Sequence, residues 1–167
     1  MSNELSSELL RRSAIDQAMR NEVIESGDMT QWNDEIDKQN TEYLEKIVEE
    51  YGWPTISMVG NEASQAAWLL VQHADHKPEF QAKCLELLKT LPKTEVRPAN
   101  IAYLEDRVRV AQGKPQLYGT QFYKAGDKVA PRLIEDESRL EERRAEMGLE
   151  TFEANQQRIL EQYGNLD

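Results

Sequence analysis

Helix-breaking residues divide the first part of this sequence into segments that are long enough for helices. The breaks fall at Gly52-Trp53-Pro54, Pro78, Pro98 and Gly113-Lys114-Pro115, and between them apolar residues return every three to four positions. Proline fits the first turn of a helix, where its missing N–H has no intrahelical partner, whereas a glycine followed closely by proline stops a helix. The pattern predicts five helices, at residues 4–25, 34–51, 60–75, 78–91 and 98–112.

The pattern changes after residue 115. Over residues 116–134 apolar and aromatic side chains alternate around a Lys-Ala-Gly-Asp turn, which predicts a β-hairpin. Two short polar helices follow, in "DESRLEERRAEMG" and "TFEANQQRILEQYG". Because a chain of 167 residues can bury about two-thirds of its unfolded surface, we expect a mainly α fold. The prediction is a compact single-domain bundle of five to seven helices over residues 1–167, with a small β-hairpin near 116–134.

The charge balance narrows the classes of partner. The chain carries 31 acidic and 20 basic residues, for a net charge of −11, so most of its surface repels a phosphate backbone and no nucleic-acid partner is expected. No apolar run approaches the ~20 residues of a membrane span, and the N-terminal residues lack the apolar core of a signal peptide. We therefore expect a cytoplasmic protein without a membrane partner. Its single cysteine, Cys84, lies in an apolar helical stripe and excludes an internal disulfide framework.

Polar residues occur inside the apolar stripes of the first two predicted helices. Arg12 and Asp16 lie in the middle of the stripe of helix 4–25, and Asn40 lies in that of helix 34–51. A buried charge is costly unless it is paired, and a buried amide needs partners for both its ends. These residues indicate either an internal polar network or the wall of a polar pocket.

The predicted helix 98–112 has a polar and aromatic face that is separate from both its core stripe and its solvent side. Tyr103, Asp106 and Arg107 lie on that face. Arg107 could clamp a carboxylate or phosphate of a ligand in a bidentate pair, or it could join a buried ion network. In the following segment, Gln116 and Tyr118 could supply neutral hydrogen bonds to a ligand, as could Gln121.

Both histidines of the chain lie in "VQHADHKPEFQ", residues 71–81. His73 and His76 share one side of helix 60–75, whereas Asp75 points nearly the opposite way as long as the helix continues to residue 75. Three interpretations remain open. The imidazoles could bind one metal ion together with carboxylates from other helices. Alternatively, one of them, oriented by Asp16 or Asp106, could transfer protons. They could also be structural hydrogen-bonding groups.

Several well-known signatures are absent from the sequence. There is no dinucleotide fingerprint, no phosphate-binding glycine loop, no C-x-x-C pair and no serine nucleophile elbow. These absences argue against NAD enzymes, thiol redox enzymes and serine hydrolases. The sequence leaves open the cofactor, the oligomeric state and whether His73 and His76 bind a metal.

Several short motifs follow one another in order: "GWP" at 52–54, "QHADH" at 72–76 with "FQ" at 80–81, "AYLEDRV" at 102–108 and "GKPQLYGTQF" at 113–122. Together they resemble an uncharacterised, mostly bacterial family that is classed as a domain of unknown function. The resemblance supplies no activity, but it marks residues that match its motifs: Asp16, Asn40, His73, Asp75, His76, Gln81, Asp106, Arg107, Gln116, Tyr118 and Gln121. Gln81 is a candidate on this ground alone.

These observations predict a polar pocket where four of the helices meet the segment 116–121. We expect it to bind a small polar molecule or a peptide terminus, with His-based acid–base or metal-assisted chemistry. The candidate catalytic residues are His73, His76 and Asp106. The candidate ligand-binding residues are Asp16, Asn40, Gln81, Tyr103, Arg107, Gln116, Tyr118 and Gln121. Whether the chain is an enzyme stays open. The alternative is an acidic interaction or immunity-type protein that masks a basic partner protein, in which the His/Asp/Arg network is structural.

Overall fold

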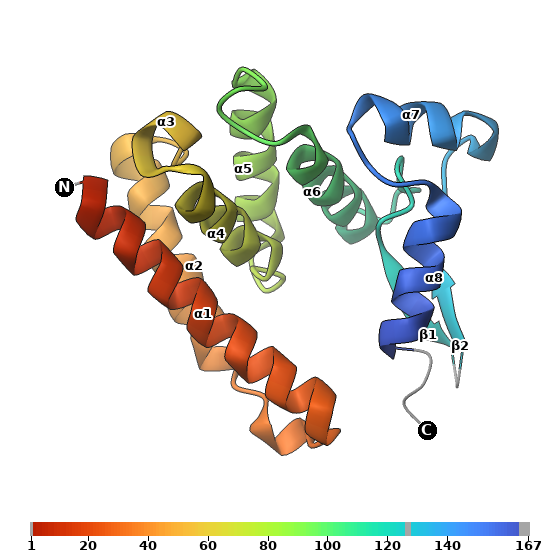
Figure 1. Ribbon diagram of the computed structural model, residues 1–167, viewed down its shortest axis with the longest axis horizontal. Helices are drawn as coiled ribbons and strands as arrows, with labels where there is room; N and C mark the ends of the chain where they lie inside the picture. The colour runs from red at the N-terminus through yellow and green to blue at the C-terminus, as the bar shows by residue number, and fades with distance from the viewer. Residues whose placement is uncertain (1, 126–127, 164–167) are drawn as a thin grey trace. The chain divides into compact units, whose positions relative to one another are not determined.

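The computed structural model describes residues 2–125 and 128–163. Within them the chain is mainly helical with one two-stranded antiparallel hairpin, which confirms the predicted fold class (Figure 1). The chain divides into two compact units, Met1–Val96 and Arg97–Asp167, and each is described by itself. One domain over residues 1–167 stays a prediction. Among the described helices, none combines the length and the apolar composition that a membrane span requires.

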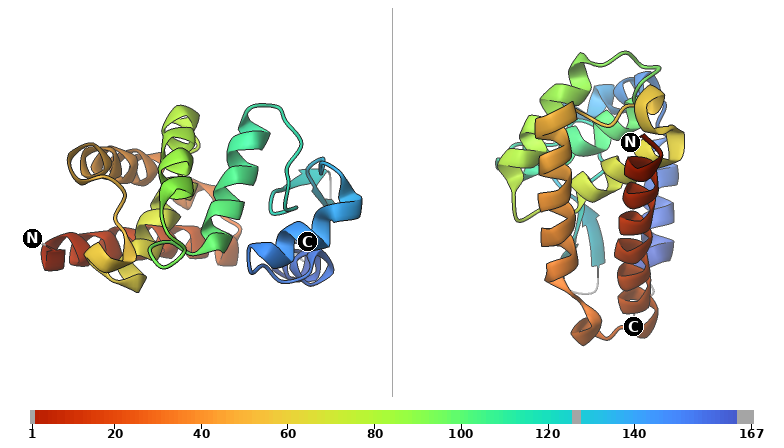
Figure 2. Two further views of the ribbon diagram at one scale, coloured as in Figure 1. Left: turned by 90° about the horizontal axis from the view of Figure 1, so that it is seen from above. Right: turned by 90° about the vertical axis from the view of Figure 1, so that its left-hand side faces the viewer.

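The first unit is built from helices alone within its described residues. Its elements are α1 (Ser2–Ser26), the short 3₁₀ helix η1 (Met29–Gln31), α2 (Asp34–Tyr51), α3 (Ile56–Val59), α4 (Asn61–Gln72) and α5 (Pro78–Thr90). α1 and α2 run antiparallel on either side of η1, as the right-hand view of Figure 2 shows. α4 packs on both of them. The predicted helix bounds agree to within a few residues, but η1 and α3 were not predicted.

Small residues let α4 approach its neighbours closely. Ala63, Ala67 and Leu70 on α4 are buried, and Leu9 of α1 and Leu44 of α2 are completely buried as well. Asn33 begins α2, since its side chain accepts a hydrogen bond from the Glu35 N–H group. The core of this unit therefore lies where α4 packs on α1 and α2.

Helix α4 ends at Gln72, three residues before the predicted end. Pro78 begins α5, and the residue before a proline avoids the helical region of backbone space. Lys77 accordingly has φ −132° and ψ 67°. The chain therefore uses residues 73–77 to turn from one helix into the next, and His73 becomes the C-cap residue of α4.

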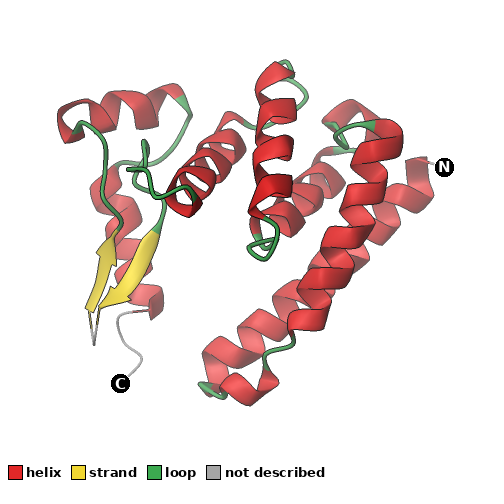
Figure 3. Ribbon diagram, turned by 180° about the vertical axis from the view of Figure 1, so that it is seen from behind, coloured by secondary structure: helices red, strands yellow, loops and turns green. Residues whose placement is uncertain are grey.

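The second unit combines three helices with the hairpin. Its described elements are α6 (Pro98–Ala111), β1 (Phe122–Ala125), β2 (Lys128–Pro131), the 3₁₀ helix η2 (Glu137–Arg139), α7 (Leu140–Glu146) and α8 (Phe152–Tyr163). Phe122 of β1 pairs with Pro131 of β2. α8 lies against the hairpin, as Figures 1 and 3 show from opposite sides, and Phe122 stacks on Phe152 with ring centroids 6.3 Å apart.

The hairpin is shorter than the predicted stretch 116–134. Gln116 and Ile134 form only an isolated bridge, and residues 117–121 belong to neither strand. In this loop Gly119 has a φ of +67°, and a Cβ atom added there would lie 2.7 Å from the Phe152 ring. The loop therefore depends on glycine both for its left-handed backbone and for its contact with α8.

Replacing Gly119 by alanine tests this dependence. The left-handed backbone costs an alanine about 1 kcal/mol, and displacing the Phe152 ring adds roughly 1–3 kcal/mol. Gly113→Ala is the matched control, because Gly113 has a φ of +71° but no atom within 4 Å of an added Cβ. We expect Gly119→Ala to be the more destabilising of the two in urea unfolding. Equal losses of unfolding free energy would show that the contact with Phe152 is unimportant.

Candidate functional site

Asp16 is the centre of a charged network in the first unit. Its side chain, in the middle of α1, is completely buried. The Nδ1 atom of His73 lies 2.9 and 3.0 Å from its two oxygens, Gln17 donates to it at 2.9 Å, and Arg20 donates through Nε at 3.2 Å. A carboxylate can only accept hydrogen bonds, so Nδ1 of His73 carries the proton and donates it.

Arg20 extends this network to α2. Its Nη2 atom donates to Asp37 at 2.6 Å, and its guanidinium lies 4.6 Å from the centre of the Trp32 ring. The side chains of Arg20 and Asp37 are largely buried. The chain of contacts His73–Asp16–Arg20–Asp37 therefore ties the C-terminal end of α4 to α1 and to the first turns of α2.

The pKa values of the two carboxyl groups of the network are shifted in opposite directions. Burial alone would raise the pKa of Asp16, but hydrogen bonds from His73 and Gln17 and the charges of His73 and Arg20 lower it below its ordinary value. The pKa of Asp37 is raised, because burial and the nearby negative charge of Asp16 outweigh its contact with Arg20. Asp16 is thus firmly ionised, whereas Asp37 is the carboxyl group that takes up a proton first.

A pocket of about 330 Å³ opens beside the network. Polar and aromatic side chains from α1, from the start of α2 and from the turn after α4 line it: Arg20, Trp32, Asp34, Asp37, Lys38, His73, Asp75 and His76. Both histidines lie at the pocket. Asp75 lines the pocket as well, because α4 ends at Gln72 and does not continue to residue 75 as predicted.

The same residues raise the question of a metal. Ligand atoms of Asp16, Asp37 and His73 all lie within 4.8 Å of one another. Arg20, however, already contacts both carboxylates and compensates part of their charge. A metal ion would have to compete with the guanidinium for these carboxylates, whereas acid–base chemistry at His73 leaves the network intact.

Asn40 and Gln81 belong to the first unit but do not line this pocket. Asn40 accepts a hydrogen bond from Arg12 at 3.3 Å; its buried Nδ2 atom has no hydrogen-bond partner among the described residues. Gln81 donates to the carbonyl groups of Val71 and Gln72 at 3.1 and 3.3 Å. These carbonyls belong to the last turn of α4, where intrahelical partners are missing, so Gln81 caps that helix.

Asp106 is the buried carboxylate of the second unit. Its oxygens accept hydrogen bonds from the backbone N–H groups of Leu117 at 2.7 Å, Tyr118 at 3.0 Å and Thr120 at 2.9 Å, and from the Thr120 hydroxyl group at 2.9 Å. Burial raises the pKa of Asp106, and these donors offset that effect only in part. Asp106, on α6, therefore anchors the loop that begins at Leu117. Of the two aspartates that were candidates to orient an imidazole, Asp16 is the one that contacts His73.

Other predicted residues of the second unit support the same loop. Gln116 is completely buried, and its side chain bonds to both the N–H and the C=O of Gln121. Tyr118 donates its backbone N–H to Asp106, and the Gln121 side chain donates to the Thr120 hydroxyl at 3.2 Å. The Tyr103 hydroxyl accepts from Arg158 at 3.4 Å. Arg107 is half-buried on α6. Ligand binding by these residues stays a prediction.

Sequence reasoning missed three important charged residues. Arg20 lies one turn after Asp16 and could have been found as its i+4 partner. Asp37 gave no signal, because it sits in an ordinary acidic first turn of α2. Arg144 is buried and donates to the carbonyl oxygens of Tyr118 and Glu150. The sequence predicts only a short polar helix there, and the burial of Arg144 depends on contacts that are distant in the sequence.

Replacing Asp16 by asparagine tests the network. The change removes the negative charge and replaces one of the two acceptor oxygens by an NH₂ donor that faces His73, Gln17 or Arg20. We therefore expect a loss of about 3–5 kcal/mol in unfolding free energy, against almost none for the exposed control Glu22→Gln on the same helix. Because folding lowers the pKa of Asp16, its contribution is fully present above its unfolded pKa of about 4 and is lost as the pH falls through the folded value. Urea unfolding between pH 2 and pH 7 should show this loss in the wild type and not in Asp16→Asn. Parallel pH profiles would contradict it.

Comparison with other proteins gives one match. No curated protein and no solved structure matches this chain. Residues 3–166 match the Family of unknown function (DUF6624). The match covers nearly the whole chain and agrees with the family type that the motifs indicated. This chain belongs to DUF6624, a family of unknown function.

Proposed function

We propose that the pocket beside His73 binds a small polar molecule and that His73 exchanges a proton with it through Nε2. The observation that carries the proposal is the hydrogen bond between Nδ1 of His73 and the buried carboxylate of Asp16. A carboxylate on Nδ1 fixes the ring orientation and the tautomer, and it stabilises the imidazolium that forms when Nε2 takes up a proton.

The position of His73 supports a reactive role over a purely structural one. An Asp–His pair that only stabilises the fold needs no contact with solvent or ligand. The His73 side chain, by contrast, is 18% exposed and lines the pocket. His73 is also the C-cap of α4, where the helix dipole favours a positive charge. Both features suit a group that gains and loses a proton in contact with a ligand.

The lining of the pocket indicates the chemistry of the ligand. Its volume of about 330 Å³ lies at the small end of ligand sites. Both cationic and anionic side chains line it, with Lys38 and His76 exposed and Trp32 offering an apolar surface. None of the lining residues is serine, threonine or cysteine. The reaction that fits best is proton transfer to or from the ligand, or the activation of a water molecule.

A thermal-shift screen with small carboxylic acids, amines, amino acids and sugar phosphates tests this proposal. We expect at least one compound class to raise the melting temperature of the wild type and not that of His73→Gln, because the variant lacks the Nε2 proton acceptor. Glu22→Gln serves as the control and should respond like the wild type. Compounds that stabilise His73→Gln as strongly as the wild type, or a panel in which no compound stabilises either, would overturn the proposal.

Two further measurements separate the alternatives. Imidazole ¹⁵N NMR should show His73 protonated at Nδ1 in the neutral protein, and this preference should weaken in Asp16→Asn. Elemental analysis of the purified protein should find no stoichiometric metal. A retained transition metal that is lost in His73→Gln would assign the cluster to metal binding and contradict the acid–base role.

A further inference from the structure

An apolar groove lies between α1, α2 and α3 in the first unit, away from the residues that line the His73 pocket. Its volume is about 410 Å³, and its walls are the side chains of Leu5, Tyr43, Ile47, Tyr51 and Met58, with Glu4 and Glu8 at the edge. Tyr51 is 40% exposed, and Tyr43, Ile47 and Met58 are half-buried. Tyrosine and methionine are the residue types that gather where proteins bind other proteins.

The surroundings of the groove are strongly acidic. In residues 2–59, which form α1 to α3, acidic residues outnumber basic ones by more than two to one. Glu8 at the groove is paired with Arg11 and Arg12. Glu49 and Glu50 are exposed at the end of α2 and add negative charge to this unit. A partner that approaches this surface gains from carrying positive charge.

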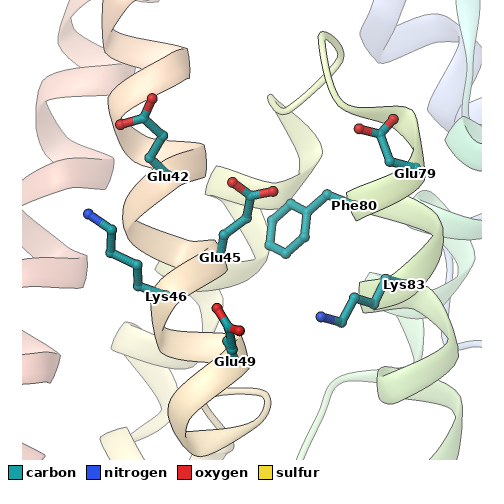
Figure 4. Close-up of a pocket in the computed structure, with 7 residues that line it drawn as sticks. All are labelled: Glu42, Glu45, Lys46, Glu49, Glu79, Phe80 and Lys83. Atoms are coloured by element: carbon teal, nitrogen blue, oxygen red, sulfur yellow. The ribbon is translucent and has the colours of Figure 1, made fainter.

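The other side of α2 adds to this charge. A second groove of about 480 Å³ separates α2 from α5, and Figure 4 shows Glu42, Glu45 and Glu49 of α2 across from Glu79 and Phe80 of α5. Lys46 and Lys83 also line it, and Glu45 is paired with Lys77, which leaves Glu42, Glu49 and Glu79 against the two lysines. The exposed glutamates of α2, Glu42, Glu49 and Glu50, form an acidic ridge. α2 thus contributes to an apolar groove and to an acidic one.

The walls of the apolar groove also restrict the backbone of an occupant. They come from three helices and include no strand. An extended strand would find no sheet edge to pair with here, so the occupant has to satisfy its own backbone hydrogen bonds, as a helix does.

We propose that this groove is a docking site for an amphipathic helix of a partner protein. The helix lays large apolar side chains between Tyr43, Ile47, Tyr51 and Met58, and its lysine and arginine residues face the acidic ridge of α2. The docking site shares no residue with the His73 pocket. The two proposals can therefore be tested independently of each other.

A synthetic leucine–lysine amphipathic helix is a suitable probe. Two control peptides keep one property each: in one the leucines are replaced by glutamine, in the other the lysines by glutamate. We expect the probe to bind the wild type, with amide shifts in ¹H–¹⁵N spectra centred on Tyr43, Ile47, Tyr51 and Met58, and each control peptide to bind at least about tenfold more weakly. Equal binding of the glutamine peptide would reduce the interaction to unspecific charge attraction and overturn the proposal.

Matched variants of the protein complete the test. Ile47→Asp places a charge in the groove, whereas Ile15→Asp changes a 43% exposed isoleucine of α1 outside it. We expect Ile47→Asp to weaken binding about tenfold or more and Ile15→Asp to leave it unchanged. Tyr51→Ala, at a more exposed position, provides a second variant if Ile47→Asp fails to fold. Equal affinities for Tyr51→Ala and the wild type, or shifts that cluster outside the groove, would contradict the docking site.

Discussion

A carboxylate inside a helical core has to be given hydrogen-bond donors, and each unit of this protein contains one such carboxylate in the middle of a helix. Asp16 on α1 and Asp106 on α6 are both completely buried. An unpaired buried charge costs several kcal/mol in real proteins, roughly as much as the stability of a small domain. The elements that surround each aspartate are therefore fixed in part by the need to bring donors to it.

The two aspartates receive different kinds of donor. Asp106 is held mainly by backbone N–H groups, which neither titrate nor exchange partners without unfolding of the loop. Asp16 is held by the side chains of His73, Gln17 and Arg20, and one of these carries a proton that can leave. The donors of Asp16 are side chains that line or border a pocket, and this difference is why the proposed chemistry is assigned to the first unit.

The sequence pattern identified the two buried aspartates but not all their partners. Asp16 and Asp106 were found because each departs from the expected face of a helix, and this signal depends only on helical periodicity. The choice between them as partner of an imidazole depends on tertiary contacts, and so does the burial of Arg144. Asp75 was misplaced because the end of α4 is set by a turn into α5, and helix ends are the least certain feature of such a pattern.

Gln81 and Gln116 show why a polar residue in a motif is weak evidence for a binding site. Both are buried, and the side chains of both form hydrogen bonds with backbone groups at a helix end or in a loop. A buried amide that completes a helix end or a loop is under as much constraint as one that holds a ligand. Sequence alone does not separate the two cases, because both give a buried glutamine within a motif.

The loop from Leu117 to Gln121 has no regular secondary structure, yet most of its backbone polar groups are bonded to side chains. Besides Asp106, Arg143 donates to the Leu117 carbonyl group, Arg144 to that of Tyr118 and Asn155 to that of Gly119. Loops usually absorb changes of chain length, since their backbone faces water. In this loop an inserted or deleted residue would shift donors away from a buried anion and acceptors away from a buried cation. The length of this segment is therefore as tightly constrained as the spacing of residues along a core helix.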